Sequence, residues 1–445
     1  MKFDQSIFRA YDIRGTYPDQ LNEEVARRVA LAYAEKLKPN SVVVGRDLRE
    51  ASEKMEGAVK EALISRGVKV YDAGEMTNPM MGFAVFNYGY DGGIILSASH
   101  NPIGYGGLKM FTKNAVSIPG EDFEIKKYSI EGVPNFAREI GLVEKIDISD
   151  DYVAFLRSVI DISGLKKKKI LFDPMFGSVN LILDKILTDL PVEAVKIHDR
   201  ADKLFGGLKE PNPYNYQMQK DALGAVKKHK PDFGVMWDGD GDRVFFIDEN
   251  ANFIEAPYIT AILCEYILTQ KPKSKIVCDT RIIWPIAKAV EANGGSLIET
   301  RSGYRFLKEK MTEVSSPFAA ETTAHYFFEE MKNMDNGIIP FLMVWKLLSD
   351  SGKTLSQLIA PYKKDHFMME EIKKEVSNID KVLERVKKQY QGYESHNLDG
   401  LSIISDQFRF NLRSSNTEPV IKLNMEARSK EILEAEKSKI LALLK

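Results

Sequence analysis

The chain has 445 residues, about three times the length of an ordinary domain, so several domains are expected. Hydrophobic residues make up 44% of it and charged residues 28%, a balance that excludes disordered, collagen-like and coiled-coil chains. The 62 Lys and Arg residues nearly balance the 64 Asp and Glu residues, giving a net charge of -2. No global field therefore draws the chain to nucleic acid or to an anionic membrane.

Cysteine content and hydropathy indicate the compartment. Cys264 and Cys278 are the only cysteines and lie outside any CxxC spacing, which excludes a disulfide framework and a zinc–cysteine site. The first residues lack a basic stretch followed by an apolar one, and no apolar run approaches the roughly 20 residues that span a membrane. We expect a cytoplasmic protein that binds neither nucleic acid nor membrane.

A short β-branched run, a loop and an amphipathic helical stretch recur along the chain. The runs are 41–44 (SVVV), 169–172 (KILF) and 275–278 (KIVC), and each leads into a loop that carries an aspartate. Continuous apolar strands that alternate with helices are typical of a mostly parallel or mixed sheet that is buried on both faces. We predict three related α/β domains.

The C-terminal stretch has a different pattern. Residues 420–426 (VIKLNME) carry apolar side chains at alternate positions, which is typical of a strand with one solvent-facing side. A Lys- and Glu-rich amphipathic helix is expected over residues 429–445. We predict a small α+β domain that starts near Tyr362.

The first candidate site is a serine loop. Residues 97–102 (SASHNP) follow an apolar run and precede a glycine-rich loop, 104–109 (GYGGLK). A strand thus delivers Ser99 to a loop tip, the glycines let the backbone approach a ligand, and Lys109 can neutralise phosphate charge. One interpretation is a nucleophilic or phosphorylated serine. The other is an ordinary Ser/Asn/Pro turn that closes a strand.

The second candidate site is acidic. Residues 238–243 (DGDGDR) lie between two apolar runs. Asp238, Asp240 and Asp242 can converge on one hard cation, for which Mg²⁺ is the natural choice. A calcium EF-hand is a rival, but Arg243 takes the place of its required glycine. A plain surface turn would pack like charges together without compensation. We therefore predict a metal site.

Three further segments offer hydrogen-bond donors. Residues 413–419 (RSSNTEP) place a guanidinium, hydroxyls and an amide on one turn, which suits an anion or a plain hairpin equally. Residues 321–325 (ETTAH) could contact sugar hydroxyls and transfer a proton through the histidine, although a helix capping box explains them as well. Residues 8–15 (FRAYDIRG) add arginines in a segment that alone indicates only a charged arm.

Together and in this order, the motifs resemble the α-D-phosphohexomutase family, most closely its bacterial phosphomannomutase branch. The resemblance runs end to end, because FRAYDIRG, SASHNP, DGDGDR and RSSNTEP all match signatures of that family. It implies three related α/β domains with mixed sheets and a smaller C-terminal α+β domain around a central cleft. Domain I would carry the phosphoserine loop, domain II the metal loop, domain III the sugar loop and domain IV the phosphate loop. Their implied limits are residues 1–148, 149–249, 250–361 and 362–445.

The resemblance also implies an activity, that of an intramolecular phosphotransferase (an isomerase). A phosphoserine at Ser99 would donate to a hexose phosphate, giving a hexose 1,6-bisphosphate that returns its other phosphoryl group to the serine. We expect a phosphomannomutase that interconverts mannose 6-phosphate and mannose 1-phosphate and also accepts glucose phosphates. Mg²⁺ would be its cofactor, hexose 1,6-bisphosphate its activator and a small-molecule hexose phosphate its partner.

Several alternatives stay open at this point. Phosphoglucomutase and phosphoglucosamine mutase belong to the same class, and the sugar preference decides among them. Outside the class, a metal-dependent serine phosphatase or a non-catalytic sugar-phosphate-binding protein would share part of the pattern. The sequence does not decide between a monomer and a dimer.

The resemblance assigns roles to individual residues. The catalytic set is Ser99, His100, Lys109, Arg14 and His325. Lys109 and His325 are the candidates for proton transfer. The metal set is Ser99, Asp238, Asp240 and Asp242. The substrate-binding set is Tyr11, Arg14, Arg243, Arg281, Tyr304, Glu321, Thr323, His325, Arg413, Ser415, Asn416 and Thr417.

The chain departs from the family pattern in domains II and III. Ala320 and Thr323 each add a methyl group where the sugar loop commonly has glycine and serine, which bears on sugar selectivity. Tyr304 takes the place of a histidine, so a possible positive charge is lost. The loop 173–177 (DPMFG) matches only loosely, and we expect it to be structural.

Overall fold

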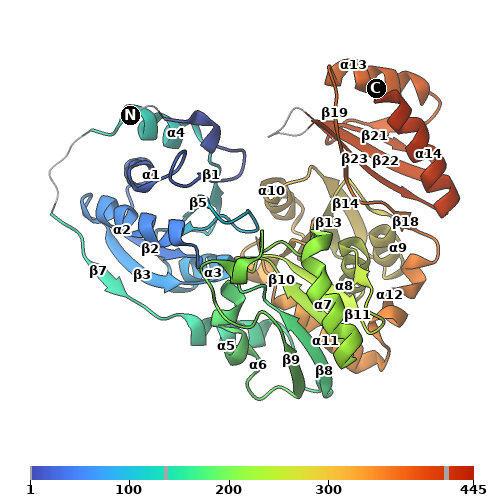
Figure 1. Cartoon of the computed structure of the whole chain (residues 1–445), viewed down its shortest axis with the longest axis horizontal. Helices are drawn as coiled ribbons and strands as arrows, with labels where there is room; N and C mark the ends of the chain where they lie inside the picture. The colour runs from blue at the N-terminus through green and yellow to red at the C-terminus, as the bar shows by residue number, and fades with distance from the viewer. Residues whose placement is uncertain (1–2, 135–138, 415–419, 445) are drawn as a thin grey trace. The chain divides into compact units, whose positions relative to one another are not determined.

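The computed structural model describes residues 3–134, 139–414 and 420–444 (Figure 1). The chain forms two compact units, one made of Met1–Phe253 and Glu330–Gly352 and the other of Ile254–Glu329 and Lys353–Lys445. Each unit is built around two β-sheets. No helix in the described ranges is long and apolar enough to cross a membrane. The limits of the four domains stay a prediction.

The first sheet of the first unit positions the serine loop. Its elements are β1 (Ile13–Thr16), α1 (Glu23–Leu37), β2 (Ser41–Arg46), α2 (Glu50–Ile64), β3 (Lys69–Glu75), α3 (Asn78–Tyr88), β4 (Gly92–Leu96), β5 (Tyr105–Thr112), β6 (Ser117–Ile118), α4 (Phe123–Glu131) and β7 (Val143–Lys145). The strand order is β1-β5-β4-β2-β3-β7, with β6 paired to β5. β4 is buried at every residue and runs parallel to β2 and antiparallel to β5. The carboxyl ends of β2 and β4 therefore meet at one edge, where the serine loop begins.

The second sheet of the first unit positions the acidic loop. Its part of the chain contains α5 (Ser149–Val159), β8 (Lys168–Asp173), α6 (Leu183–Leu187), β9 (Val192–Lys196), α7 (Tyr216–His229), β10 (Phe233–Trp237), β11 (Val244–Asp248), β12 (Phe253–Ile254), β17 (Met334–Asp335) and α11 (Ile339–Ser351). The strand order is β12-β11-β10-β8-β9. β8 is parallel to β9 and β10, whereas β10 and β11 form an antiparallel hairpin.

Helices from distant parts of the sequence cover this sheet. α7 packs against β8 and β10. On the side of α11, the Phe341 ring lies 5.6 Å from the Phe172 ring and 5.8 Å from the Trp237 ring, measured between centroids. Both β10 and β11 are buried at every residue as a result. The loop between these strands is thus held by a rigid hairpin.

The third sheet belongs to the second unit. Its part of the chain contains α8 (Ala256–Gln270), β13 (Lys275–Asp279), α9 (Trp284–Ala292), β14 (Ser296–Thr300), α10 (Tyr304–Val314), β15 (Phe318–Ala320), β16 (Tyr326–Phe328) and α12 (Leu355–Lys363). Within the unit the strand order is β14-β13-β15-β16, with β13 parallel to β14 and β15, and β15 antiparallel to β16. Residues 321–325 form the turn between β15 and β16. The capping-box interpretation of these residues is therefore wrong, because no helix starts there.

The fourth sheet is antiparallel. Its part of the chain contains β18 (Phe367–Met368), β19 (Ile372–Glu375), α13 (Ile379–Gln389), β20 (Glu394–His396), β21 (Leu401–Ile404), β22 (Phe408–Ser414), β23 (Val420–Ala427) and α14 (Lys430–Leu443). The strand order is β18-β23-β22-β21-β20, with β19 also paired to β23. Residues of α13 and α14 pack with β21, β22 and β23 in one hydrophobic core. Three mixed α/β sheets and this small α+β sheet confirm the predicted fold class.

β23 differs from its sequence-based description. Its apolar face is buried as predicted, but Asn424 and Glu426 on the other face are buried too. The carboxylate of Glu426 accepts hydrogen bonds from the Ile283 and Trp284 N–H groups, at 2.9 and 3.0 Å. At Glu426 this face therefore docks on the start of α9 instead of facing solvent, since the buried carboxylate finds hydrogen-bond donors there.

Candidate functional site

Ser99 lies on the loop that leaves the carboxyl end of β4. Its φ is +50°, a left-handed conformation that costs a non-glycine residue roughly 1–2 kcal/mol. Its N–H donates to Ser97 Oγ at 2.9 Å, and its hydroxyl donates to Asp238 Oδ2 at 3.0 Å. His100 Nδ1 lies 3.2 Å from the same hydroxyl. A strained, buried serine aimed at a carboxylate is typical of a functional site, not of a plain turn.

The acidic loop, residues 238–242, connects β10 to β11. One carboxylate oxygen from each of Asp238, Asp240 and Asp242 lies within 4.8 Å of the others, and all three side chains are buried. Gly241 has a φ of +73°, which lets the backbone turn tightly enough for the three side chains to converge. Strands flank this loop, so the EF-hand alternative, which needs two helices, is wrong.

Cationic groups balance part of the acidic charge. Lys109 Nζ lies 2.8 Å from Asp240 Oδ2 and 3.0 Å from Asp242 Oδ2. Burial would lower the pKa of Lys109, but these two carboxylates raise it well above its ordinary value. Arg243 Nε donates to Asp238 Oδ2 at 2.9 Å, and its side chain is buried. Arg243 thus holds a candidate metal ligand in place.

The acidic loop fits a divalent cation. Asp240 Oδ1 is buried and has no hydrogen-bond partner among the described residues, and such an orphaned acceptor calls for a ligand. Asp240 Oδ2 already accepts from the Ser97 hydroxyl at 2.8 Å, which fixes the direction of the carboxylate. Hard cations such as Mg²⁺ take oxygen ligands and keep open positions for water or phosphate. The donor set therefore suits a cation that would face Ser99.

The N-terminal motif lies beside the serine loop. Arg14 Nη1, from β1, donates to Asn101 Oδ1 at 2.6 Å, and Arg14 also pairs with Asp12. Burial would lower the pKa of Arg14, but Asp12 raises it above its ordinary value. Tyr11 is half-buried in the same segment. The expected positive charge is therefore close to Ser99.

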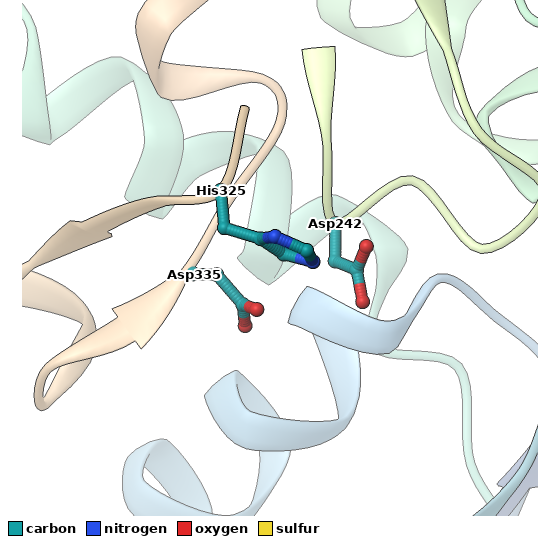
Figure 2. Close-up of side chains that lie close together, drawn as sticks. All are labelled: Asp242, His325 and Asp335. Carbon is teal, nitrogen blue, oxygen red and sulfur yellow. The ribbon is translucent and has the colours of Figure 1, made fainter. Parts of the chain in front are cut away.

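Two residues that the sequence did not assign to the site also belong to this neighbourhood. Asn78, at the start of α3, donates through Nδ2 to Asp242 Oδ2 at 3.1 Å and through its N–H to the Asp240 carbonyl at 2.9 Å. Figure 2 shows Asp242 on the acidic loop and Asp335 on β17, both in the first unit, and also draws His325 from the loop before β16. Neither Asn78 nor Asp335 was predicted as a site residue, because each follows from long-range folding and not from local spacing.

In the second unit, Glu321 and Arg281 meet because β13 and β15 are parallel neighbours whose carboxyl ends share an edge. Arg281 Nη2 donates to Glu321 Oε1 at 3.1 Å and also to Asp279 Oδ2 at 3.0 Å. His325 Nδ1 lies 2.9 Å from Glu321 Oε2. Burial would raise the pKa of Glu321, but His325 and Arg281 lower it overall. The carboxylate is held charged and oriented.

Two of the residues that depart from the family pattern, Thr323 and Ala320, adjoin this group, and the third, Tyr304, lies on α10 of the same unit. Thr323 Oγ1 lies 3.3 Å from His325 Nδ1, and Ala320 is buried as the last residue of β15. Tyr304 begins α10, and Lys308 Nζ lies 5.1 Å from the centre of its ring. The lysine places a positive charge one helical turn from the position where a histidine was expected.

A cationic group lies on the fourth sheet. Arg413 on β22 and Lys422 on β23 are register partners, and both contact one carboxylate. Glu371 Oε2 lies 3.0 Å from Arg413 Nη2, and its Oε1 lies 3.4 Å from Lys422 Nζ. Burial would raise the pKa of Glu371, but Arg413 and Arg281 lower it below its ordinary value. Glu371 and Lys422 were not predicted, since neither lies in a motif.

The structure describes only the start of the predicted phosphate-binding turn, residues 413–419. Arg413 is described, whereas Ser415, Asn416 and Thr417 lie outside the described residues.

The chain matches four family models in sequence. They are described as phosphoglucomutase/phosphomannomutase alpha/beta/alpha domains I, II and III and the C-terminal domain, and they match residues 5–131, 150–251, 256–364 and 367–443. The chain belongs to the phosphoglucomutase/phosphomannomutase family. This membership confirms the predicted family and the predicted class of enzyme, an isomerase that transfers phosphate intramolecularly.

Individual relatives of this family agree with the assignment over the whole chain. A phosphomannomutase of Escherichia coli is 35% identical, with 99% of each chain covered. A solved phosphoglucomutase/phosphomannomutase family protein of Burkholderia thailandensis is 26% identical with a TM-score of 0.89, covering 100% of this chain and 98% of the other. The N-acetylphosphoglucosamine mutase of Aspergillus fumigatus, solved with GlcNAc-6P and magnesium, shares the fold at 14% identity and a TM-score of 0.64, with coverages of 99% and 95%.

Proposed function

We propose that this protein is a phosphomannomutase that interconverts mannose 6-phosphate and mannose 1-phosphate through a phosphoserine at Ser99. The observation that carries the proposal is the geometry of Ser99, whose left-handed backbone directs the hydroxyl to Asp238 Oδ2 at 3.0 Å. A serine with that environment can carry a phosphoryl group next to a metal site. The name phosphomannomutase of several relatives that are 33–35% identical supports the choice of mannose.

The reaction needs two phosphoryl transfers with opposite direction. In the first, the bond between phosphorus and Ser99 Oγ breaks, a bond to the free hydroxyl of the hexose phosphate forms, that hydroxyl loses its proton, and Ser99 Oγ gains one. The product is a hexose 1,6-bisphosphate. In the second, the other phosphoryl group of the bisphosphate moves to Ser99 Oγ, the serine hydroxyl loses its proton, and the sugar oxygen that the group leaves regains one. A trace of hexose 1,6-bisphosphate would load unphosphorylated protein and so act as activator.

Asp238, Asp240 and Asp242, with the phosphorylated Ser99, would hold Mg²⁺. The ion would neutralise charge on the oxygens of the phosphoryl group. Arg14 and Lys109 add positive charge from β1 and β5, and His100 adds a hydrogen-bonding group 3.2 Å from the Ser99 hydroxyl. Positioned charges of this kind usually supply most of the barrier lowering in phosphoryl transfer.

Sugar recognition is proposed for the second unit. Glu321, held by Arg281 and His325, presents a charged acceptor for sugar hydroxyls, and Thr323 adds a hydroxyl beside it. His325 would take and return the hydroxyl proton, because Asp240 and Asp242 raise the pKa of Lys109 and keep this second candidate protonated. Substrate-binding roles are also proposed for Tyr304 of the second unit and for Tyr11 and Arg243 of the first.

The phosphate that does not react would be bound on the fourth sheet. Arg413 and the neighbouring Lys422 would supply positive charge, and Ser415, Asn416 and Thr417 are proposed as hydrogen-bond donors of the same turn. Because Glu371 now contacts both cations, a phosphate would compete with this carboxylate for them.

A direct assay tests the proposal. Purified wild-type protein, Ser99→Ala and Ser163→Ala are supplied with mannose 1-phosphate or glucose 1-phosphate, Mg²⁺ and a trace of hexose 1,6-bisphosphate. Ser163 is an exposed serine whose N–H and hydroxyl donate to Asp161, so its variant is the control. We expect isomerisation by the wild type and by Ser163→Ala but not by Ser99→Ala, with mannose 1-phosphate converted at least as fast as glucose 1-phosphate.

The same assay separates the alternatives. Faster turnover of glucose 1-phosphate would indicate a phosphoglucomutase instead. Release of inorganic phosphate in excess of isomerisation would indicate a serine phosphatase. Full activity of Ser99→Ala would contradict the phosphoserine mechanism itself.

A further inference from the structure

Asp47 binds the backbone of the serine loop from the neighbouring strand end. β2 and β4 are parallel, with Arg46 opposite Leu96, so the loops that follow them leave the sheet side by side. The Asp47 N–H donates to the Leu96 carbonyl at 2.8 Å, and Asp47 Oδ2 accepts from the Ala98 N–H at 3.2 Å. This aspartate extends the strand pairing up to the residue before Ser99.

Arg49, two residues further along, makes the larger set of contacts. Its guanidinium donates to the carbonyl oxygens of Ser99 at 2.7 Å, Asn101 at 2.6 Å and Pro102 at 2.8 Å. The side chain is 4% exposed, and its Nε lies 3.2 Å from Asp47 Oδ2. A guanidinium is a flat group with five N–H donors, so it can hold several carbonyls at fixed angles, which a lysine cannot do.

Phe205 fixes the same guanidinium from another side. The Arg49 Cζ atom lies 5.0 Å from the centre of the Phe205 ring, a cation–π distance. Phe205 is fully buried and has a φ of +47°, and it comes from the loop between β9 and α7. The arginine is therefore held by an ion pair and an aromatic ring, while its N–H groups point at the serine loop.

We propose that Arg49 is the positioning residue of the serine loop. By binding the Ser99 carbonyl and the two carbonyls at Asn101 and Pro102, it fixes the peptide plane after Ser99 and keeps that residue in its left-handed conformation. The Ser99 hydroxyl then stays directed at Asp238. The inference rests on the proposed function, in which this hydroxyl carries the phosphoryl group.

The physical reason is a competition between strain and hydrogen bonding. Ser99 would lower its conformational energy by relaxing to an ordinary negative φ. However, three carbonyls would lose a charged hydrogen-bond donor if the loop moved away from Arg49. With Arg49 present, the hydrogen bonds hold the strained conformation. Without it, the loop relaxes and the hydroxyl turns away from the acidic loop.

The proposal predicts an effect on turnover and not on substrate binding. Arg49 bonds to the backbone carbonyls of Ser99, Asn101 and Pro102, and none of these three residues is proposed to bind the sugar or its phosphate. Loss of the guanidinium should therefore lower kcat and leave KM nearly unchanged, which is the signature of misplaced reacting groups.

Arg157 offers a matched control. Its Nη2 also donates to three backbone carbonyls, those of Lys185, Ile186 and Thr188, at 3.2, 3.3 and 2.5 Å. It does so at the end of α6, and all three of these partners lie outside the serine loop. Arg157→Lys and Arg157→Met thus remove the same kind of interaction from a different loop.

The experiment compares Arg49→Lys and Arg49→Met with the Arg157 pair. We expect kcat to fall about tenfold in Arg49→Lys and about a hundredfold in Arg49→Met, with KM within about twofold of wild type. The Arg157 variants should keep kcat, even where thermal unfolding shows a comparable loss of stability. Equal kcat values for the two series, or a loss confined to KM, would overturn the proposal.

A crystal structure of Arg49→Met separates this proposal from the proposed function. We expect Ser99 with an ordinary negative φ and a hydroxyl that no longer contacts Asp238. A retained left-handed φ would overturn the positioning role whatever the enzyme's substrate is. If Arg49→Met does not fold, Arg49→Lys serves for the same measurement. Failure of the wild type to isomerise any hexose phosphate would instead count against the proposed function and leave this structural result unaffected.

Discussion

The two candidate regions have opposite electrostatics. In the first unit, three buried carboxylates converge beside Ser99, and Lys109 and Arg243 lie against them as counterions. On the fourth sheet the arrangement is reversed, because Arg413 and Lys422 converge on the single carboxylate of Glu371. The first region is prepared for a cation and the second for an anion. Under the proposed function, the first region would serve phosphoryl transfer and the second phosphate recognition.

The largest change should follow from a weakened acidic loop. Asp240→Asn removes one charge and the carboxylate that has an orphaned oxygen. We expect kcat to fall by about 10²–10³-fold and the Mg²⁺ concentration for half-maximal rate to rise. Steady-state kinetics across a Mg²⁺ series measures both. Asp161→Asn, a surface change, should leave both values as in wild type, and an unchanged Mg²⁺ requirement in Asp240→Asn would contradict the metal assignment.

A smaller effect is expected at Glu321, which contacts Arg281 and His325 in the second unit. Glu321→Gln keeps the shape of the side chain but removes the charge that orients His325 and Arg281. We expect kcat/KM to fall about 10- to 100-fold, mainly through KM, while spontaneous loss of phosphate from Ser99 keeps its rate. Glu313→Gln, an exposed residue of α10, is the control. A faster loss of phosphate from Ser99 would show that the two regions do not have separate tasks.

A pH-dependent contribution to stability is predicted at Glu426. Burial raises the pKa of this carboxyl to about 7, so the folded protein holds a proton that the unfolded chain releases at lower pH. This difference in pKa adds to the free energy of unfolding. The added stability is fully present below the pKa that the carboxyl has in the unfolded chain, is lost as the pH rises through 7, and amounts to about 3 kcal/mol at most. Between pH 5 and 8, the free energy of unfolding should therefore fall less in Glu426→Gln than in wild type, as measured by chemical denaturation.

The control for this titration is Glu434→Gln on the exposed side of α14. It should keep the wild-type pH dependence. The interpretation would be wrong if Glu426→Gln and wild type lost stability in parallel over this pH range.

The smallest effect is expected at Glu371, and its sign is unusual. Glu371→Gln removes the carboxylate that competes with phosphate for Arg413 and Lys422. We expect KM for the hexose phosphate to decrease by about two- to fivefold, in keeping with the modest worth of partly exposed ion pairs. Glu370→Gln, the exposed neighbour, should have no effect. A raised KM in Glu371→Gln would mean that the carboxylate orients the cations instead of opposing their ligand.

The sequence predicted the local parts of both regions. Runs of apolar residues that end in polar loops predicted the strands before Ser99 and Asp238, and the alternating aspartates predicted carboxylates that converge as a candidate cation site. Hydrophobic periodicity reports which face of an element is buried and which residues follow its end. These are short-range properties, so they can be predicted without knowledge of the fold.

The missed features all depend on which elements become neighbours. Arg49 reaches Ser99 only because β2 and β4 are parallel partners, and Asn78 reaches Asp242 across 164 positions of the sequence. Lys422 and Asn424 were expected on a solvent-facing side of β23, yet Asn424 is buried and Glu426 on the same side bonds to the start of α9. No local spacing encodes such contacts, because they are set by topology and by packing between distant segments.

The most direct test of the account is a single-turnover experiment. Protein phosphorylated at Ser99 is isolated, mixed with mannose 6-phosphate and Mg²⁺ without added bisphosphate, and quenched at short times. The account predicts that phosphoserine disappears as hexose 1,6-bisphosphate appears in equal amount, followed by mannose 1-phosphate. Loss of the phosphoryl group as inorganic phosphate, or its persistence on Ser99, would contradict transfer between this serine and the sugar.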